Sequence, residues 1–295
     1  MKKSKPLRDK LINWGIFIAL SVIWGSSFIL MKAGMVALSP YQVASIRILS
    51  AGLVLLPFAR KALLQVPRNK MPLVILSGLI GNFFPAYLFC ISEIKLDSSL
   101  VGILNALTPL FTILVGVGFF QLKVTTSKVV GVIIGFIGLC LLMRASGTIS
   151  LQSLSYAALV LLATLLYGIN VNMVGRHLQG VGSLNIASLA FTFLIIPCLI
   201  ILYFNHYFSL PLGSWTVQRS TLAAFILGAM GTAFASILFY MLVKRAGTLF
   251  ASLVTYGIPF IAVLWGLWDG ESVNIWQMLC LGIILSGVYL VNKKS

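Results

Sequence analysis

Long apolar segments follow one another along almost the whole chain, separated by short polar stretches. Each is close to the roughly 20 apolar residues that cross a bilayer core as a helix. None shows the alternation of polar and apolar positions that is typical of a strand. Because lipid leaves backbone groups unsatisfied unless they form helices or closed barrels, we expect helices. The segments are 12–31, 41–59, 71–92, 98–120, 127–143, 153–175, 184–204, 220–242, 248–268 and 275–291.

The positions of the basic residues predict how these helices are oriented. With a cytoplasmic N-terminus, 16 of the 21 Lys and Arg residues fall in cytoplasmic segments, and one, Arg47, lies inside a helix. Most of the acidic residues fall in the outer segments: Glu93, Asp97, Asp269 and Glu271. Because basic residues are retained on the cytoplasmic side, this distribution predicts ten spans with both termini cytoplasmic. The expected location is the cell (inner or plasma) membrane.

The composition agrees with an integral membrane protein. Hydrophobic residues make up 60% of the chain and charged residues 9%, which is too few polar groups for a soluble domain. The formal net charge of +16 lies in alternating loops, which favours an orientation signal over nucleic-acid binding. The first apolar segment is too long for a signal peptide and is expected to be retained. The four cysteines and two histidines show no metal-ligand spacing, so we expect no metal and no cofactor.

Glycine and proline residues repeat along the chain at fixed offsets. Gly81 and Pro109 correspond to Gly231 and Pro259 at an offset of 150, and Trp24 corresponds to Tyr167 at an offset of 143. Each repeat holds five helices, an odd number, so the second half enters the membrane upside down. The predicted fold is therefore an all-α integral membrane protein of ten transmembrane helices in two inverted five-helix repeats, 12–143 and 153–291. Inverted repeats are the basis of many secondary transporters, with the substrate site between the halves.

Several sequence stretches resemble the drug/metabolite transporter superfamily, specifically its ten-helix group with two EamA-type domains. They are the Trp24-Gly25-Ser26-Ser27 turn, "ASIRILSAGL" around Arg47, "LVGILNALTPLFTILVGVGFF", "FASLVTYGIPFIAVLWGLWDGE" and "GIILSGVYLV". The chain departs from the family at Gln121, where a Glu is usual, whereas Glu271 keeps the acid in the second half. The resemblance implies a metabolite transporter and leaves its substrate open.

Polar residues recur at helical spacing within the third, fourth, eighth and ninth segments. Polar side chains inside spans usually face the bundle interior or a water-filled cavity. We therefore consider the following as substrate-binding residues: Asn82, Asn105, Thr232, Tyr240 and Thr255. The alternative is that they form only interhelical hydrogen bonds, which contribute about 0.6 kcal/mol each on average.

Aromatic residues deep in the segments are candidate walls of the same site: Trp24, Phe84, Tyr167 and Tyr256. Apolar packing alone also accounts for such residues. We expect a central cavity lined by helices one, three, four, six, eight and nine. Helices five and ten are expected at the periphery because they are nearly all apolar and glycine.

Arg47 is the one charge well inside a predicted span. A charge at such depth is costly, so it should face water, a partner or an anionic group of the substrate. Alternatively, its long side chain reaches the outer interface, toward Glu93 or Asp97.

Prolines and glycines suggest hinges and packing surfaces. Pro109 and Pro259 are expected to kink the fourth and ninth helices and are candidate hinges. The glycine-rich fifth and tenth helices predict close helix contact, within a monomer or in a homodimer.

The function that these features favour is a secondary transporter working by alternating access. No Asp or Glu lies within a span, so the sequence shows no carboxylate proton relay, and a neutral or zwitterionic solute such as an amino acid is favoured, with efflux as the direction. A membrane-embedded enzyme that modifies a lipid or metabolite is the alternative, but it needs convergent catalytic groups that are not visible. A channel normally needs oligomeric symmetry. The expected partners are a small-molecule substrate and the lipid bilayer.

Overall fold

The computed structural model describes residues 7–96, 98–122, 124–145, 151–268 and 274–292, and these residues contain helices and no strands. The first half consists of α1 (Leu7–Gly34), α2 (Pro40–Gln65), η1 (Arg68–Lys70), α3 (Met71–Gly78), η2 (Leu79–Phe83), α4 (Phe84–Ser92), α5 (Ser98–Asn105), α6 (Thr108–Phe120) and α7 (Thr126–Ala145). The second consists of α8 (Leu151–His177), α9 (Ser183–Thr192), α10 (Ile195–Phe204), η3 (Tyr207–Ser209), α11 (Trp215–Ile226), η4 (Leu227–Phe234), α12 (Ala235–Ala246), α13 (Thr248–Ser252), α14 (Val254–Trp268) and α15 (Ile275–Asn292).

Within the described residues, six stretches are long and apolar enough to cross a membrane. They are Leu7–Gly34, Pro40–Gln65, Arg68–Ser92, Leu154–His177, Ser183–Phe204 and Trp215–Ala246. Four shorter apolar helices fall in the remaining predicted segments, at Thr108–Phe120, Thr126–Gly138, Thr248–Ile261 and Met278–Gly287. The all-α architecture is confirmed, whereas the count of ten spans stays a prediction.

Three of the predicted helices are broken. The segment 98–120 divides between Asn105 and Thr108, and 248–268 divides at Leu253, while 184–204 divides between α9 and α10. Proline explains the first break, because its ring clashes with the carbonyl four residues earlier and it has no N–H to donate. Pro109 lies in the first turn of α6, so the carbonyl it displaces is that of Asn105. Pro259, in contrast, lies inside α14, beyond the second break.

Two further segments contain a π-helical stretch in the middle. The stretches are η2, between α3 and α4, and η4, between α11 and α12, and they correspond to each other at the sequence offset of 150. In η4 the Thr232 hydroxyl donates to the Leu227 carbonyl five residues earlier, at 3.2 Å. Such π segments are rare in helices and frequently mark functional sites.

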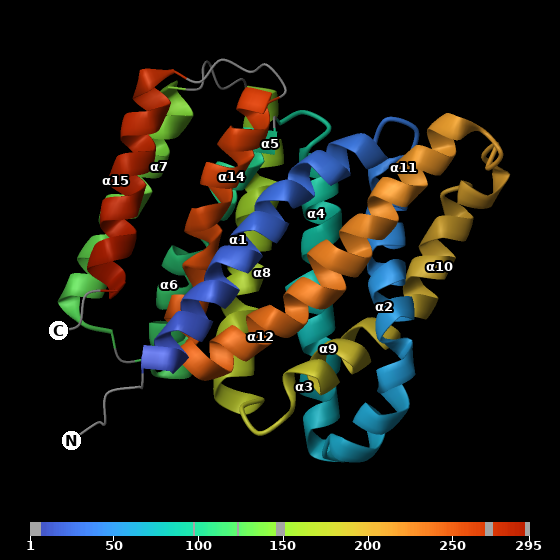
Figure 1. Ribbon diagram of the computed structural model, residues 1–295, viewed down its shortest axis with the longest axis horizontal. Coiled ribbons are helices and arrows are strands. Elements are labelled where there is room, and N and C mark those ends of the chain that lie inside the picture. The colour runs from blue at the N-terminus through green and yellow to red at the C-terminus, as the bar shows by residue number, and fades with distance from the viewer. Residues whose placement is uncertain (1–6, 97, 123, 146–150, 269–273, 293–295) are drawn as a thin grey trace.

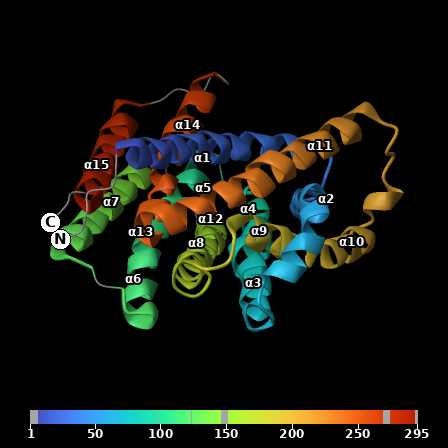
Figure 2. The same ribbon diagram turned by 60° about the horizontal axis from the view of Figure 1, so that its bottom comes forward.

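The helices form a broad bundle with α7 and α15 paired at one edge (Figures 1 and 2). In Figure 1, α1 begins and α15 ends at the same lower left corner of the bundle. The centre of the bundle is occupied by α4, α5, α8 and α12, with α2 and α10 toward the opposite edge.

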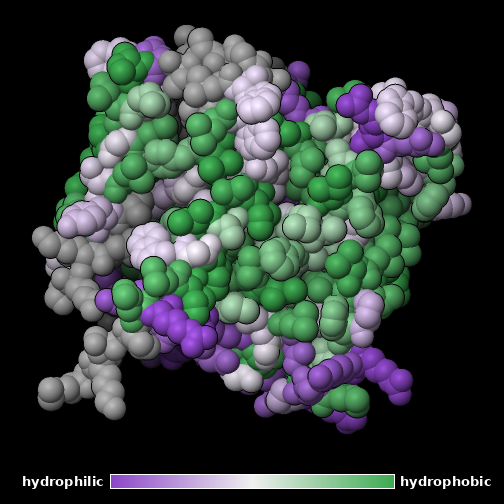
Figure 3. All heavy atoms as spheres, viewed as in Figure 1, coloured by the Kyte–Doolittle hydropathy of each residue, from purple (hydrophilic) through white to green (hydrophobic). Residues whose placement is uncertain are grey.

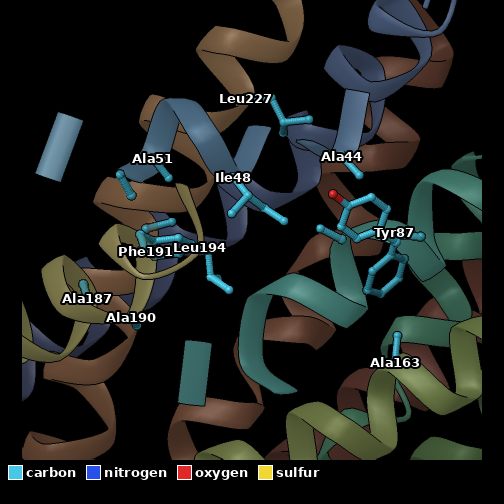
Figure 4. Packing of buried hydrophobic residues seen from close by; sticks show 14 of the residues in the cluster. Ala44, Ile48, Ala51, Tyr87, Ala163, Ala187, Ala190, Phe191, Leu194 and Leu227 are labelled. Carbon is cyan, nitrogen blue, oxygen red and sulfur yellow. The ribbon is translucent and has the colours of Figure 1, made fainter. Parts of the chain in front are cut away.

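Small residues allow α2 and α9 to pack closely (Figure 4). A Cβ placed on Gly52 of α2 would lie 2.9 Å from the Phe191 carbonyl oxygen of α9, and Ala51 of α2 and Ala187 of α9 are fully buried. In lipid, where burial of apolar surface between helices gives little driving force, such close van der Waals contact holds helices together. A buried hydrogen bond adds to it, because the Tyr87 hydroxyl of α4 lies 2.7 Å from Ser45 Oγ of α2.

The face of the molecule drawn in Figure 3 is hydrophobic across its middle and hydrophilic near its lower edge and upper right corner. Many large apolar side chains are exposed, among them Leu64, Phe119 and Trp268. A soluble protein rarely exposes apolar patches of this extent, so this surface fits contact with lipid.

The glycines of α7 and α15 pack against each other within the chain. A Cβ placed on Gly287 would lie 2.4 Å from the Gly131 carbonyl oxygen and 2.7 Å from Gly135 N. Both contacts are with backbone, so a side chain at this position can fit only if the two helices separate. Gly282, on the same helix, has open space around its Cβ position.

We therefore expect Gly287→Leu to lower the free energy of unfolding by about 1–3 kcal/mol, the range typical of overpacked sites. The measurement is thermal unfolding of the purified protein in detergent. Gly282→Leu is the matched control and should unfold near the wild-type temperature. Equal melting temperatures for the two variants would contradict the packing described here.

Candidate functional site

A central cavity lies between the two halves, at the π segments and helix breaks. Its volume is at most about 810 Å³, since part of that space is open to solvent. The lining side chains come from α1, η2, α4, α5, α6, α8, η4, α12, α13 and α14, with Arg47 of α2 in addition. Apart from α2, these elements belong to the first, third, fourth, sixth, eighth and ninth predicted segments, which are the ones expected to line the cavity. They include Trp24, Arg47, Asn82, Asn105, Tyr167, Asn170, Ser236, Tyr240, Ser252 and Thr255.

Aromatic rings from both halves form apolar walls of this cavity. Trp24 Nε1 donates to the Gly231 carbonyl at 3.1 Å, and its ring lies 5.2 Å from that of Phe239. Tyr167 stacks on Phe89 with centroids 5.9 Å apart. The hydrogen bond from Trp24 joins α1 to η4, so it fixes the indole against the segment where the helix is distorted.

A polar network crosses the cavity between α3–η2 and α12. Ser77 Oγ donates to Asn170 Oδ1 at 2.8 Å and lies 3.1 Å from the Tyr240 hydroxyl. Asn82 Nδ2 is 3.4 Å from the same hydroxyl, and Ser236 Oγ is 3.3 Å from Asn82 Oδ1. The hydrogen bonds of Asn82 are long, so its amide is only weakly held by the protein and is available to a ligand.

The breaks between α5 and α6 and between α13 and α14 carry the same hydrogen bond. Thr108 Oγ1 donates to the Asn105 carbonyl at 2.7 Å, and Thr255 Oγ1 donates to the Ser252 carbonyl at 2.8 Å. The two Thr-to-carbonyl pairs correspond at an offset of 147 residues, so Asn105 and Ser252 occupy equivalent positions at the breaks. The repeat in the sequence, with its offset of 150, instead pairs Asn105 with Thr255. Each threonine hydroxyl satisfies one carbonyl that the broken helix leaves free.

Arg47 is directed into the cavity. Its Nε donates to Thr232 Oγ1 of η4 at 2.7 Å, and its Nη1 lies 3.8 Å from Met31 Sδ. Among the described residues that line the cavity it is the one charged side chain. The guanidinium therefore supplies positive potential to a site whose other polar groups are amides and hydroxyls.

The structure does not bring every predicted site residue to the cavity. Phe84 is 47% exposed on the outer surface and packs on Phe83. Tyr256 is buried in a separate cluster, where the Cβ position of Gly135 lies 2.8 Å from its hydroxyl. Thr232 contacts the cavity through Arg47 and is absent from the lining.

Asn170 lines the cavity and Ser77 donates a hydrogen bond to it, and neither residue was predicted from the sequence. Both sit inside predicted helices at mid-depth, and the amide of Asn170 was a signal of the same kind as Asn82. Gly81 explains its position, because a Cβ on Gly81 would lie 2.1 Å from Asn170 Nδ2. Asn172, two residues further along α8, has a structural role: its Nδ2 donates to the carbonyls of Thr112 at 2.9 Å and Gly168 at 2.8 Å.

At the end of the bundle where α1 begins, polar contacts join the two halves. Arg245 of α12 pairs with Asp9 at 2.9 Å and donates from Nε to Asn13 Oδ1 at 3.1 Å. Arg176 of α8 donates to the Phe120 carbonyl and to Gln121 Oε1. These contacts link α1 to α12 and the end of α6 to α8. Within the described residues, no cluster of His, Cys, Asp and Glu is suited to hold a metal ion.

The model of the EamA-like transporter family matches residues 13–144 and again residues 154–293. An uncharacterized transporter of Archaeoglobus fulgidus is 25% identical over 95% of this chain and 98% of its own length. The uncharacterized inner membrane transporter YedA of Escherichia coli is 25% identical over 96% of this chain and 92% of its own.

One further relative matches part of the chain, and one solved structure shares its fold. A protein of Salmonella typhimurium named "Probable amino-acid metabolite efflux pump" is 30% identical over 44% of this chain and 43% of its own length. A solved crystal structure with 16% sequence identity has the same fold, with a TM-score of 0.71 over 98% of this chain and 97% of that chain.

Proposed function

Because the chain belongs to the EamA-like transporter family, and is therefore a multi-pass membrane transporter, we propose that it exports a small neutral or zwitterionic metabolite by alternating access. The substrate class is that of amino acids and similar solutes carrying a carboxylate. Export runs across the inner membrane, with both termini in the cytoplasm.

The observation that carries the substrate class is the position of Arg47 in the cavity. A guanidinium binds a carboxylate through parallel N–H groups, which gives both energy and orientation. The remaining described lining consists of aromatic rings, amides and hydroxyls, which suit an uncharged side chain and an amino group. The name of the Salmonella relative supports the same class.

Alternating access is supported by where the helices are interrupted. The four segments that carry η2, η4 and the breaks at Asn105 and Ser252 all line the cavity, two from each half. Interrupted helices near the midplane of inverted repeats are typical of transporters whose halves rock around a fixed site. The Arg245–Asp9 pair then acts as a contact that breaks when the bundle opens at that end.

The direct test is exchange in liposomes that contain the purified protein. Vesicles are loaded with one unlabelled solute at a time and exposed to the labelled form outside. We expect neutral amino acids to exchange many times faster than in protein-free liposomes, and amines or sugars without a carboxylate not to exchange. If carboxylate-free solutes exchange as well as amino acids do, the proposed substrate class is wrong.

The orientation has its own test. A reporter active only outside the cytosol should give no signal when fused after Ser295 and a clear signal when inserted in the loop near Asp269. Activity after Ser295 would contradict an even number of spans.

A further inference from the structure

Glu93 differs from the other acidic side chain in the described part of the chain, Asp9. Asp9 is paired with Arg245, whereas neither carboxylate oxygen of Glu93 forms an ion pair or a hydrogen bond of full geometry, although the Ser98 hydroxyl lies near enough to favour the ionised form. Both oxygens are buried, although other atoms of the residue remain partly exposed. Glu93 caps the C-terminal end of α4, just after the candidate span that ends at Ser92.

The charged, titratable and hydroxyl groups near Glu93 come from α1, α2, α4 and α5. Lys32 lies at the end of α1, Arg47 on α2, Cys90 on the preceding turn of α4 and Ser98 at the start of α5. From α8, the Tyr156 carbonyl accepts a hydrogen bond from Ser92 at 3.1 Å. Neither Lys32 nor Arg47 forms an ion pair with Glu93, so an ionised carboxylate here is buried with no cation in direct contact.

This turn lies close to the cavity. Cys90 Sγ is 3.6 Å from Met31 Sδ, and Met31 Sδ is in turn 3.8 Å from Arg47 Nη1. A single methionine side chain thus separates the last turn of α4 from the guanidinium that faces the cavity.

We propose that Glu93 is a proton-binding site that is occupied in the conformation described here and that loses its proton when the outer ends of α1, α2 and α4 separate. An isolated buried carboxylate is far more costly ionised than protonated, so burial of both oxygens selects the neutral form. Separation of these helices hydrates the carboxylate or brings it to Arg47, and either change favours ionisation. Loss of this proton links the pH on the outer side to Arg47, the proposed substrate-binding residue. A consequence for transport therefore rests on the proposed function.

The direction of the expected pH dependence follows from the same burial. Burial raises the pKa of Glu93 to about 8, with the Ser98 hydroxyl and the charges of Arg47 and Lys32 acting in the opposite direction. An unfolded chain titrates near its ordinary value of about 4.3. Between these values the folded state holds a proton that the unfolded state does not, so stability falls as the pH rises.

Infrared spectroscopy tests proton binding without any substrate. The chain contains two glutamates, Glu93 and Glu271. In a Glu271→Gln variant grown with glutamate labelled with ¹³C at its side-chain carboxyl, Glu93 is the one labelled acid. We expect the C=O stretch of a protonated carboxylic acid at neutral pH and its loss on titration, with a midpoint near the value given above.

Thermal unfolding provides the second measurement. The melting temperature of the wild type should fall as the pH rises from about 4.3 toward the folded-state pKa. This fall should be smaller in Glu93→Gln and unchanged in the control Asp9→Asn. A labelled carboxylate that is already ionised at pH 6 overturns the proposal, and so does a melting profile that Glu93→Gln leaves unaltered. Because neither measurement involves transport, a negative result here is distinct from a failure of amino acid exchange.

Discussion

Replacement of Arg47 by glutamine is expected to weaken substrate binding on the order of 10²-fold or more. Removing one partner of a buried, hydrogen-bonded charge pair costs about 2–5 kcal/mol, much of it from the charge left unpaired. Here the unpaired group is the substrate carboxylate, left in a cavity that has no other described cation. The measurement is the apparent substrate constant for exchange in liposomes, taken with the best substrate of the solute panel.

Two variants separate this role from a structural one. Arg47→Lys keeps the charge but loses the planar pair of N–H groups, so it should retain part of the affinity. Arg219→Gln, which removes a cation stacked near Trp215 on α11, should exchange like the wild type. If Arg47→Gln exchanges normally while its melting temperature drops, the arginine serves only to hold η4 through Thr232.

Asn82→Leu is expected to abolish most exchange while changing the melting temperature little. The two hydrogen bonds that Asn82 makes within the protein are 3.3 and 3.4 Å long and contribute little to folding. A bound solute that loses its amide partner is left with an unsatisfied polar group, which costs about 1–3 kcal/mol. We expect the same result for Asn105→Leu, because Asn105 lines the cavity at the break between α5 and α6 and its side-chain oxygen accepts a hydrogen bond of 3.2 Å from Thr108 Oγ1.

Asn172→Leu is the matched control for these amides. Asn172 is buried to a similar degree as Asn105 and more deeply than Asn82, and it donates two hydrogen bonds of normal length to Thr112 and Gly168. Its replacement should lower stability and leave the apparent substrate constant of the folded protein unchanged. The binding assignment fails if Asn82→Leu behaves like Asn172→Leu.

The order of apolar segments and their internal repeat were enough to predict the all-helical architecture and the peripheral place of α7 and α15. Hydrophobicity specifies where a chain enters lipid, and paired glycines and prolines reveal duplication. The π segments were not predicted, because a π-helix has the same hydrophobic pattern as an α-helix and differs only in its hydrogen bonds. The break at Leu253 also lacks a local signal, since Pro259 lies beyond it inside α14.

For the cavity, polarity at mid-depth was a better guide than aromatic character. Asn82 and Asn105 line it, as polar groups excluded from lipid are expected to do. Phe84 and Tyr256 do not, because an aromatic ring is equally stable against lipid or in a packed cluster, and sequence spacing does not distinguish these surroundings. Asn170 was missed although it carried the same signal as Asn82, and its place depends on the close approach to Gly81.

Alternating access is the central element of the proposed mechanism, and side-specific labelling of the cavity tests it most directly. A single cysteine replaces Ser236, a cavity residue, in a background without Cys90, Cys140, Cys198 and Cys280. A thiol reagent that cannot cross membranes is then applied to right-side-out and to inverted vesicles. We predict labelling from both sides, at rates that change when the exchanged solute is added. Labelling from one side alone, at a rate that the solute does not change, would contradict alternating access.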